Sequence, residues 1–454
     1  MSDGAVPKDA PLSRADRYLV LTAGFLGWMC AGLHMQITQL AAQPAAIDLL
    51  TRADELDGAR YLALNIAPAA ALSPEDREQL LAWRTLIGRW HAWFQCAFLF
   101  GAAAGGLFFG WVGDRFGRSR AMAASILTYS ILAAAAACAQ SPVQFWLLWF
   151  LACTGVGGMW PNGVALVSEA WSSWSRPAVA GVIGTAANIG IFVMASIAAQ
   201  VAITADHWRW AVLVGAVPVV LGIFALLTVP ESPRWLAAQA LGPAAGAPAA
   251  QAGAFRPPLL RITLIAIVLA TVPIIGGWGT ANWMNPWADQ AGAALQPPDF
   301  LLKARLGQAR ALTGMVGSVL GGWIASRLGR RQTYFLVSVT SLALAQYMFG
   351  FLTPTDPSFL LWAAVLGFVS GIYFGWLPLC LPELFPTRVR ATGAGVGFNF
   401  GRIITALTML AVGALMQLFA GDYARIGRVT SLLFVLGMVA IWLVPDTSER
   451  QLED

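Results

Sequence analysis

Residues 110–118 have the sequence Gly-Trp-Val-Gly-Asp-Arg-Phe-Gly-Arg, and residues 322–330 repeat it as Gly-Trp-Ile-Ala-Ser-Arg-Leu-Gly-Arg. The second copy follows the first by about 212 residues, nearly half of the 454-residue chain. Each copy ends one long apolar stretch and begins another. A segment that recurs in the same setting after half a chain length indicates that the two halves are copies of one another.

Two further pairs of segments recur in the same order and at nearly the same offset. They are Glu169 with Arg176 and Glu383 with Arg390, and the tripeptides Pro-Glu-Ser at 230–232 and Pro-Asp-Thr at 445–447. Three matches in one order support duplication rather than chance similarity. In a membrane protein, such repeats are typical of secondary transporters, whose solute site lies between the two related bundles.

The composition places the chain in a membrane. Hydrophobic residues make up 58% of the chain and charged residues 11%, whereas soluble domains have about 25% charged residues. We therefore expect the net charge of +5 to set the orientation in the bilayer rather than to bind nucleic acid. The five cysteines lie in apolar stretches without metal-ligand spacing, so we predict neither a metal site nor a cofactor.

Apolar stretches long enough to cross about 30 Å of hydrocarbon, about 20 residues each, occur six times in each half. In the first half they are residues 18–42, 90–112, 121–140, 143–168, 177–202 and 208–229. In the second half they are residues 259–288, 305–326, 332–353, 358–382, 391–419 and 429–445. The sequence predicts an all-α membrane protein whose twelve transmembrane helices form two pseudo-symmetric six-helix bundles.

The topology follows from the ends of the chain and from its basic residues. We expect no removable signal peptide, because the first apolar stretch is too long and acidic residues precede it. An even number of spans places both termini on one side, and Lys and Arg are in excess there, as the positive-inside rule requires of the cytoplasmic side. We expect a multi-pass protein of the bacterial cytoplasmic (inner) membrane, with Arg402 as the one basic residue within a span.

Three segments organise the chain. Residues 1–235 are expected to form the N-terminal bundle, including a long outer loop at 43–88, and residues 259–454 the C-terminal bundle. Residues 236–258, rich in Ala, Gly and Pro, are interpreted as a cytoplasmic linker. In the outer loop, Ser73 followed by Pro74 predicts the start of a short helix.

Small residues also recur with the duplication. Gly101 and Gly105 precede the first copy of the repeated segment, and Gly317 and Gly321 precede the second. Because small residues four apart allow two transmembrane helices to approach closely, this spacing predicts a packing seam in each half.

On these motifs the chain resembles the major facilitator superfamily over essentially its whole length. Residues 110–118 are similar to that superfamily's loop between spans two and three. The sequence Pro-Glu-Ser-Pro-Arg-Trp at 230–235 resembles the end of span six in sugar porters and related metabolite symporters, and residues 382–390 resemble their junction of spans ten and eleven. The resemblance implies that superfamily's fold and the transport of a small solute by alternating access.

The charged residues of these motifs are expected to form a cytoplasmic latch, which holds the inner face shut while the pathway opens outward. Carboxylates can accept hydrogen bonds from arginines and from helix N-termini. Binding to lipid headgroups is the alternative role for these charges. The predicted latch residues are Asp114, Arg115, Arg118, Glu169, Arg176, Glu231, Arg234, Arg327, Arg330, Glu383 and Arg390. Because Ser326 replaces the second copy of Asp114, the C-terminal latch is predicted to be weaker.

All acidic residues fall in loops or at the ends of the predicted spans. Related metabolite symporters often have acids near the positions of Ala31 and Met159, so carboxylate-based proton symport is not expected here. His34 in the first span is a candidate proton site, because its charge can change near neutral pH. A hydrogen bond to a neighbouring helix is the alternative role of this histidine.

The solute site is predicted to be lined by neutral amides and indoles. Amides both donate and accept hydrogen bonds, and indole rings stack on apolar faces of ligands. We also expect Pro286 to bend the seventh span. The candidate solute-binding residues are Trp28, Gln36, Gln39, Asn162, Asn188, Trp278, Asn282, Asn285, Trp376 and Arg402.

Arg402 decides between two classes of solute. A buried guanidinium needs an anion or carbonyl partners, so it either clamps a carboxylate or has a structural role. The favoured interpretation is a transporter of a sugar or another polyhydroxylated compound. The alternatives are an organic anion transporter that uses Arg402, and a transporter-like sensor that binds solute without moving it. We expect a monomer in the lipid bilayer, and no motif indicates an enzyme.

Overall fold

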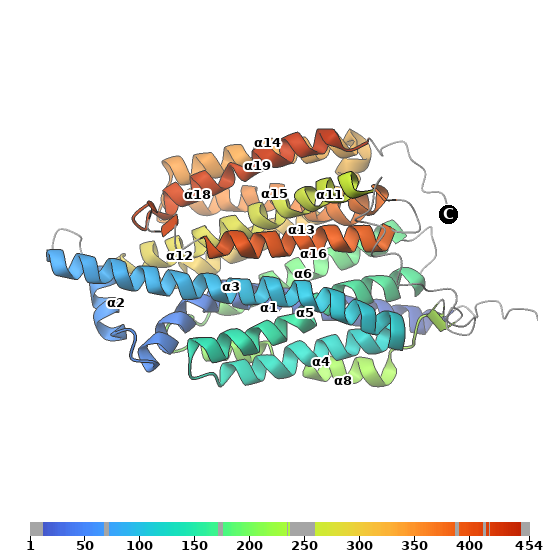
Figure 1. Cartoon of the computed structure of the whole chain (residues 1–454), viewed down its shortest axis with the longest axis horizontal. Coiled ribbons are helices and arrows are strands. Elements are labelled where there is room, and N and C mark those ends of the chain that lie inside the picture. Colours follow the sequence, from blue (N-terminus) through green and yellow to red (C-terminus); the bar gives the residue numbers. More distant parts are fainter. Residues whose placement is uncertain are drawn as a thin grey trace, which may run out of the picture.

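The computed structural model describes residues 12–67, 72–170, 176–233, 235–236, 259–385, 390–411, 415–416 and 418–445. Within these ranges the regular structure consists of helices, and no strand is present. The helices lie side by side along one direction in two groups, one from each half of the chain (Figure 1).

The lower, blue-to-green group in Figure 1 is the N-terminal bundle, and the upper, yellow-to-red group is the C-terminal bundle. The first comprises α1 (Arg14–Arg52), α2 (Gly58–Ile66), α3 (Pro74–Phe116), α4 (Arg118–Ala137), α5 (Pro142–Ala170), α6 (Arg176–Ala198), α7 (Arg209–Val214) and α8 (Val219–Thr228). The second comprises α11 (Leu260–Pro273), η3 (Ile274–Gly279), α12 (Thr280–Ala293), α13 (Leu302–Leu328), α14 (Arg330–Phe351), α15 (Phe359–Glu383), α16 (Arg390–Leu410), α18 (Tyr423–Ser431), α19 (Leu433–Ala440) and η5 (Ile441–Leu443).

Eight of the described helices are long and apolar enough to cross a membrane. Three shorter apolar helices, Val182–Ala198, Leu260–Gly276 and Gly395–Leu410, occupy the positions of predicted spans five, seven and eleven. The remaining span is α13, whose 27 residues include four basic side chains. The twelve predicted spans in two bundles are confirmed.

The repeated segment has the same backbone in both halves. Gly117 joins α3 to α4 with φ 111° and ψ 145°, and Gly329 joins α13 to α14 with φ 92° and ψ 152°. This backbone region is accessible essentially only to glycine, because a β-carbon would clash. We call the end of the bundles that holds these two glycines the termini end, because α1 begins there and η5 ends there, and the opposite end the α2 end (Figure 1).

Both predicted packing seams are present. A β-carbon on Gly105 would clash with the backbone of Thr154 in α5, and one on Gly317 would clash with the carbonyl of Phe368 in α15. The helix pairs α3 with α5 and α13 with α15 therefore approach closely at equivalent places, as small residues allow.

The predicted outer loop at 43–88 is mostly helical, which corrects the expectation. α1 continues to Arg52, α2 follows, and α3 begins at Pro74 and runs without a break to Phe116. Ser73 caps α3 as predicted, with its Oγ accepting a hydrogen bond from the Asp76 amide at 3.1 Å. A helix of 43 residues is about 65 Å long, about twice the hydrocarbon thickness, so α3 extends beyond the bundles at the α2 end (Figure 1).

The irregular turn of span seven lies elsewhere than predicted. Pro286 sits inside the regular helix α12, whereas residues Ile274–Gly279, directly after Pro273, form a π-helical turn. The sequence Ile-Ile-Gly-Gly-Trp-Gly in this turn has three glycines, which favour the regular helix least after proline. The break therefore follows the glycines rather than Pro286.

Candidate functional site

The two bundles meet along two helix pairs, α3 with α16 and α6 with α13. A smaller contact joins α1 to α12 and α13. A solute that crosses between the bundles must pass the helix faces between these contacts. The polar side chains on those faces are therefore the candidates for a binding site.

Arg402 lies on the contact between α3 and α16, about 18 Å along α16 from its start. The residue is 5% exposed, and its guanidinium lies over the ring of Phe398 at 4.6 Å. Its Nη1 donates long hydrogen bonds of 3.4 Å to the Ala102 carbonyl in the opposite bundle and to Asn399 Oδ1. No carboxylate among the described residues pairs with it, so the described structure holds a positive charge at the bundle interface without an internal counter-ion.

The amides of α1 and α12 meet at the same interface. Gln39 Oε1 accepts a hydrogen bond of 3.3 Å from Asn285 Nδ2, which joins the two bundles. Gln36 Nε2 lies 2.5 Å from the position of a β-carbon on Gly307 of α13, so the Gln36 amide also reaches the other bundle. The Nε2 donors of Gln36 and Gln39 have no hydrogen-bond partner within the described structure. These buried donors can therefore bind a solute that enters between the bundles.

Two other predicted residues lie near this interface. Asn188 of α6 is half-buried, and its Oδ1 lies 4.0 Å from the place of a β-carbon on Gly314 of α13. Trp28 of α1 is 7% exposed and packs on Trp160 of α5, with 4.7 Å between ring centroids. Asn188 borders the contact between α6 and α13, whereas Trp28 packs within the N-terminal bundle.

Two basic residues of α13 depart from the prediction that Arg402 is the one basic residue within a span. α13 begins at Leu302, earlier than predicted, so that Lys303 lies within it, whereas Arg310 lies within both α13 and the predicted span at 305–326. Lys303 is 5% exposed, pairs with Asp289 of α12 at 2.9 Å and donates to the Ile203 carbonyl of the N-terminal bundle at 3.0 Å. The presence of Arg310 inside the predicted span at 305–326 could have signalled this.

The α2 end of the interface is held together by direct hydrogen bonds. Lys303 reaches Ile203 there, and Gln308 Nε2 of α13 donates to Ser196 Oγ of α6 at 3.0 Å. Together with the bond between Gln39 and Asn285, these contacts join the bundles on the α2 side of Arg402. The hydrogen bonds described at the termini end instead lie within single bundles.

Three predicted site residues are placed inside the bundles. Asn162 Nδ2 donates to the carbonyls of Phe109 and Gly158, both at 2.9 Å, and Trp376 Nε1 donates to the Arg330 carbonyl at 2.8 Å. His34 is fully buried, and its Nδ1 donates to the Cys30 carbonyl at 3.0 Å. The alternative stated for His34 was a hydrogen bond to a neighbouring helix, whereas this contact is to Cys30 of the same helix. A proton role for His34 stays a prediction.

Some predicted residues lie outside the described part of the chain. The backbone is described at Trp278, Asn282, Asp114, Arg176 and Arg390, but their side chains are not. Arg234 lies wholly outside the described residues. The roles predicted for these residues stay predictions.

The described latch residues at the termini end contact partners in their own bundle. Glu383 accepts two hydrogen bonds from Arg330, at 3.1 and 3.2 Å, within the C-terminal bundle. Glu231 accepts from the backbone amides of Arg118 and Ser119 at the start of α4, at 2.8 and 3.1 Å.

The remaining described latch residues also stay within one bundle. Glu169 accepts a hydrogen bond from the Ser232 hydroxyl. The guanidinium of Arg115 lies 5.6 Å from the ring of Trp111, and that of Arg327 lies 5.2 Å from Trp323. A latch that bridges the two bundles is therefore not formed by these contacts in this conformation and stays a prediction.

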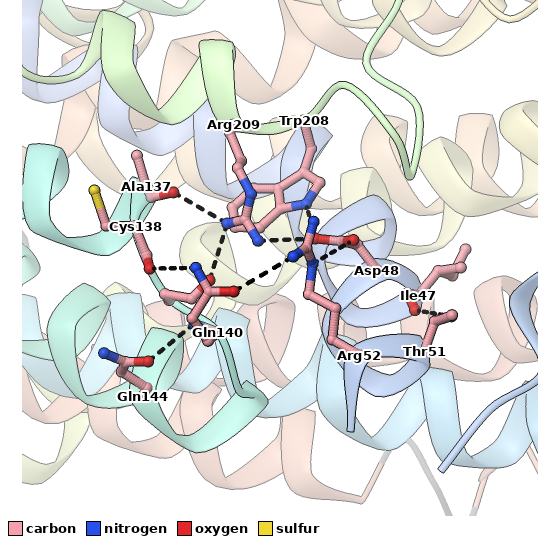
Figure 2. A network of polar contacts seen from close by, with 11 residues as sticks. Ile47, Asp48, Thr51, Arg52, Ala137, Cys138, Gln140, Gln144, Trp208 and Arg209 are labelled. Carbon is pink, nitrogen blue, oxygen red and sulfur yellow. Dashed lines mark hydrogen bonds and ion pairs between the residues drawn. The ribbon is translucent and has the colours of Figure 1, made fainter. Parts of the chain in front are cut away.

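A polar network that the sequence did not reveal fixes the α2 end of the N-terminal bundle (Figure 2). Asp48 of α1 accepts hydrogen bonds from Trp208 Nε1 and from Arg209, both at 3.0 Å. Arg209 also donates to the carbonyls of Ala137 and Ala139, at the end of α4 and just after it. These contacts tie α1, α4 and α7 together, so this end of the bundle can move as one body.

Comparisons with known proteins agree with this architecture. A family model described as Major Facilitator Superfamily matches residues 91–409. The cis,cis-muconate transport protein of Acinetobacter baylyi is 29% identical over 325 residues, which cover 70% of this chain and 76% of that protein. The niacin transporter NiaP of the same organism is 25% identical over 390 residues, which cover 80% of this chain and 86% of that protein. Among solved structures, the xylose transporter XylE from E. coli in an inward-open conformation aligns over 96% of this chain and 98% of that one, with a TM-score of 0.68 and 16% sequence identity.

Proposed function

Because the chain belongs to the major facilitator superfamily, and is therefore a secondary transporter, we propose that its solute is a small organic carboxylate. The solute crosses between the two bundles by alternating access. This choice replaces the sugar favoured from the sequence by the organic anion that was the alternative.

The observation that carries the proposal is the placement of Arg402. Its guanidinium lies at the interface of the bundles, is 5% exposed and has two long hydrogen bonds to neutral groups. A buried charge that is not paired is costly, and a planar guanidinium binds a carboxylate through two parallel hydrogen bonds. A solute carboxylate would supply the missing counter-ion.

The relatives support the same class of solute. Their names state cis,cis-muconate and niacin as the transported compounds, and both compounds are planar carboxylic acids. The amides of Gln36, Gln39 and Asn285 suit the polar atoms of such a solute. The same amides could bind sugar hydroxyls, but a neutral sugar would leave the charge of Arg402 unpaired.

The excess of basic residues supports an orientation with the termini end in the cytoplasm. In this orientation the hydrogen bonds from Lys303, Gln308 and Asn285 close the outer side of the pathway. The structure then corresponds to a state that is closed to the outside.

Uptake into proteoliposomes tests the proposal. We expect saturable uptake of labelled nicotinate or cis,cis-muconate by the wild-type protein, and at least about a hundredfold lower uptake by Arg402→Gln, because loss of a buried charge-assisted contact costs about 3 kcal/mol. Arg425→Gln removes an exposed arginine of α18 and serves as the matched control with normal uptake. Normal carboxylate uptake by Arg402→Gln would contradict the clamp, and saturable binding without any flux would favour the sensor.

A further inference from the structure

A small cavity lies between the two bundles at the α2 end, away from Arg402. Its volume is about 30 Å³, which is the space of about one water molecule. The N-terminal bundle lines it with residues of α1, α2 and α3, and the C-terminal bundle with residues of α12 and α18. The polar side chains that line it are Gln43, Tyr61, Arg84, His91, Trp283 and Tyr423.

Two of these side chains are buried without partners. His91 is 9% exposed, and neither of its ring nitrogens has a hydrogen-bond partner among the described residues. Trp283 is 3% exposed, and its Nε1 donor is likewise unpaired. Buried polar groups are almost always hydrogen-bonded, so these two point to a ligand or to water in the cavity.

The other lining groups favour an anion. Arg84 uses Nε and Nη2 to bind Asn65 Oδ1, at 3.1 and 3.0 Å, and keeps its positive charge beside the cavity. Burial raises the pKa of Tyr61 to about 12, with Arg84 opposing and Asp289 adding to the shift, so the hydroxyl stays protonated and can donate. Among the described residues no carboxylate lines the cavity, and nearby Asp289 is paired with Lys303.

The cavity is separate from the site at Arg402. His91 precedes Ala102, the backbone partner of Arg402, by eleven residues of the same helix, or about 16 Å. The cavity lies where the bundles must part if the pathway opens at the α2 end. At about 30 Å³ it is too small for a planar acid in the present conformation.

We propose that this cavity is the closed form of an entry subsite, in which Arg84, His91 and Trp283 bind the carboxylate of the solute before it reaches Arg402. The inference rests on the proposed function, since it deepens the path of the same solute. When the bundles part at this end, the donors from both sides become accessible. When the bundles close, the carboxylate moves inward, and the side chains of Arg84, His91 and Trp283 come together around the small cavity that remains.

The test uses the full-length protein in proteoliposomes and the carboxylate that the wild-type protein transports. Trp283→Phe removes the indole donor and keeps an aromatic ring. We expect it to raise the KM for uptake from the α2 side about tenfold, which corresponds to the loss of one hydrogen bond to a charged group. Trp287→Phe is the matched control, because Trp287 lies one turn further along α12 and packs on Phe349 and Phe359 within its own bundle; its KM should not change.

A second pair of variants keeps the proposal testable if Trp283→Phe fails to fold. Arg84→Gln should raise the same KM about tenfold. Arg89→Gln is the control, because Arg89 lies at an exposed position of the same helix, and its KM should not change. Melting temperatures show whether each variant is folded. An unchanged KM in a folded Trp283→Phe or Arg84→Gln protein that transports the carboxylate would overturn the entry subsite alone. If the wild-type protein transports no carboxylate, the proposed function fails, and the subsite fails with it.

Discussion

The two copies of the repeated loop have the same backbone but different partners. Gly117 and Gly329 adopt the same glycine-specific conformation at equivalent positions. The equivalent acids next to them differ: Glu169 accepts a hydrogen bond from Ser232, whereas Glu383 forms a two-bond ion pair with Arg330. The turn, which requires glycine, is therefore the same in both copies, whereas the charged contacts beside it differ.

The contacts of the C-terminal loop concern the prediction that the C-terminal latch is the weaker of the two. The described contacts of the C-terminal loop include the ion pair of Arg330 and Glu383, whose side chains are 15% and 6% exposed. Ser326, which replaces the second acid, accepts a hydrogen bond of 3.3 Å from the same arginine. The relative strength of the two latches stays a prediction, because the side chain of Asp114 lies outside the described structure.

The largest difference in stability between the loops is expected when the equivalent acid of each loop, Glu383 or Glu169, is replaced by glutamine. Glu383→Gln removes the carboxylate charge from a largely buried ion pair with Arg330 and should lower the free energy of unfolding by about 3 kcal/mol, because the buried guanidinium loses this charged partner. Glu169→Gln, which retains an acceptor for a neutral hydroxyl, should cost about 1 kcal/mol. Thermal unfolding in detergent measures both. Equal melting temperatures for the two variants would show that the ion pair adds nothing beyond the hydrogen bond at the equivalent site.

The shared turn can be tested by adding a β-carbon to each glycine. Gly329→Ala should cost about 2 kcal/mol, because its backbone conformation is essentially restricted to glycine. Gly117→Ala should cost about 3 kcal/mol, since the new methyl group adds a clash with the Glu231 carboxylate to the strained backbone. The same unfolding assay applies. A Gly117→Ala protein as stable as the wild type would contradict the positive φ angle of Gly117 in the loop.

The smallest effect is expected at the start of α4. Glu231→Gln keeps an oxygen for the amides of Arg118 and Ser119 but removes the charge that favours a helix N-terminus. The expected loss is about 0.5 to 1 kcal/mol at low ionic strength, and it should shrink as salt screens the charge. Melting temperatures of both proteins at low and high salt measure this. A difference that does not depend on salt would assign the effect to geometry rather than to charge.

Much of the architecture was determined by the sequence alone. The repeated segment and twelve apolar stretches predicted the two bundles, and the glycines four apart predicted the contacts of α3 with α5 and of α13 with α15. These features depend on local chemistry: an apolar stretch of about 20 residues must span the bilayer as a helix, and a glycine is required wherever a backbone conformation or a close approach excludes a β-carbon.

Only the tertiary structure decided which polar residues meet. The sequence placed Gln36 and Gln39 among the candidate solute-binding residues, but it did not show that Asn285 and Gly307 lie opposite them. The pairing of Lys303 with Asp289 and the cavity beside His91 were likewise invisible in the sequence. Helical periodicity fixes the direction of a side chain relative to its own axis, whereas its partner depends on how every other helix packs, which is a property of the whole fold.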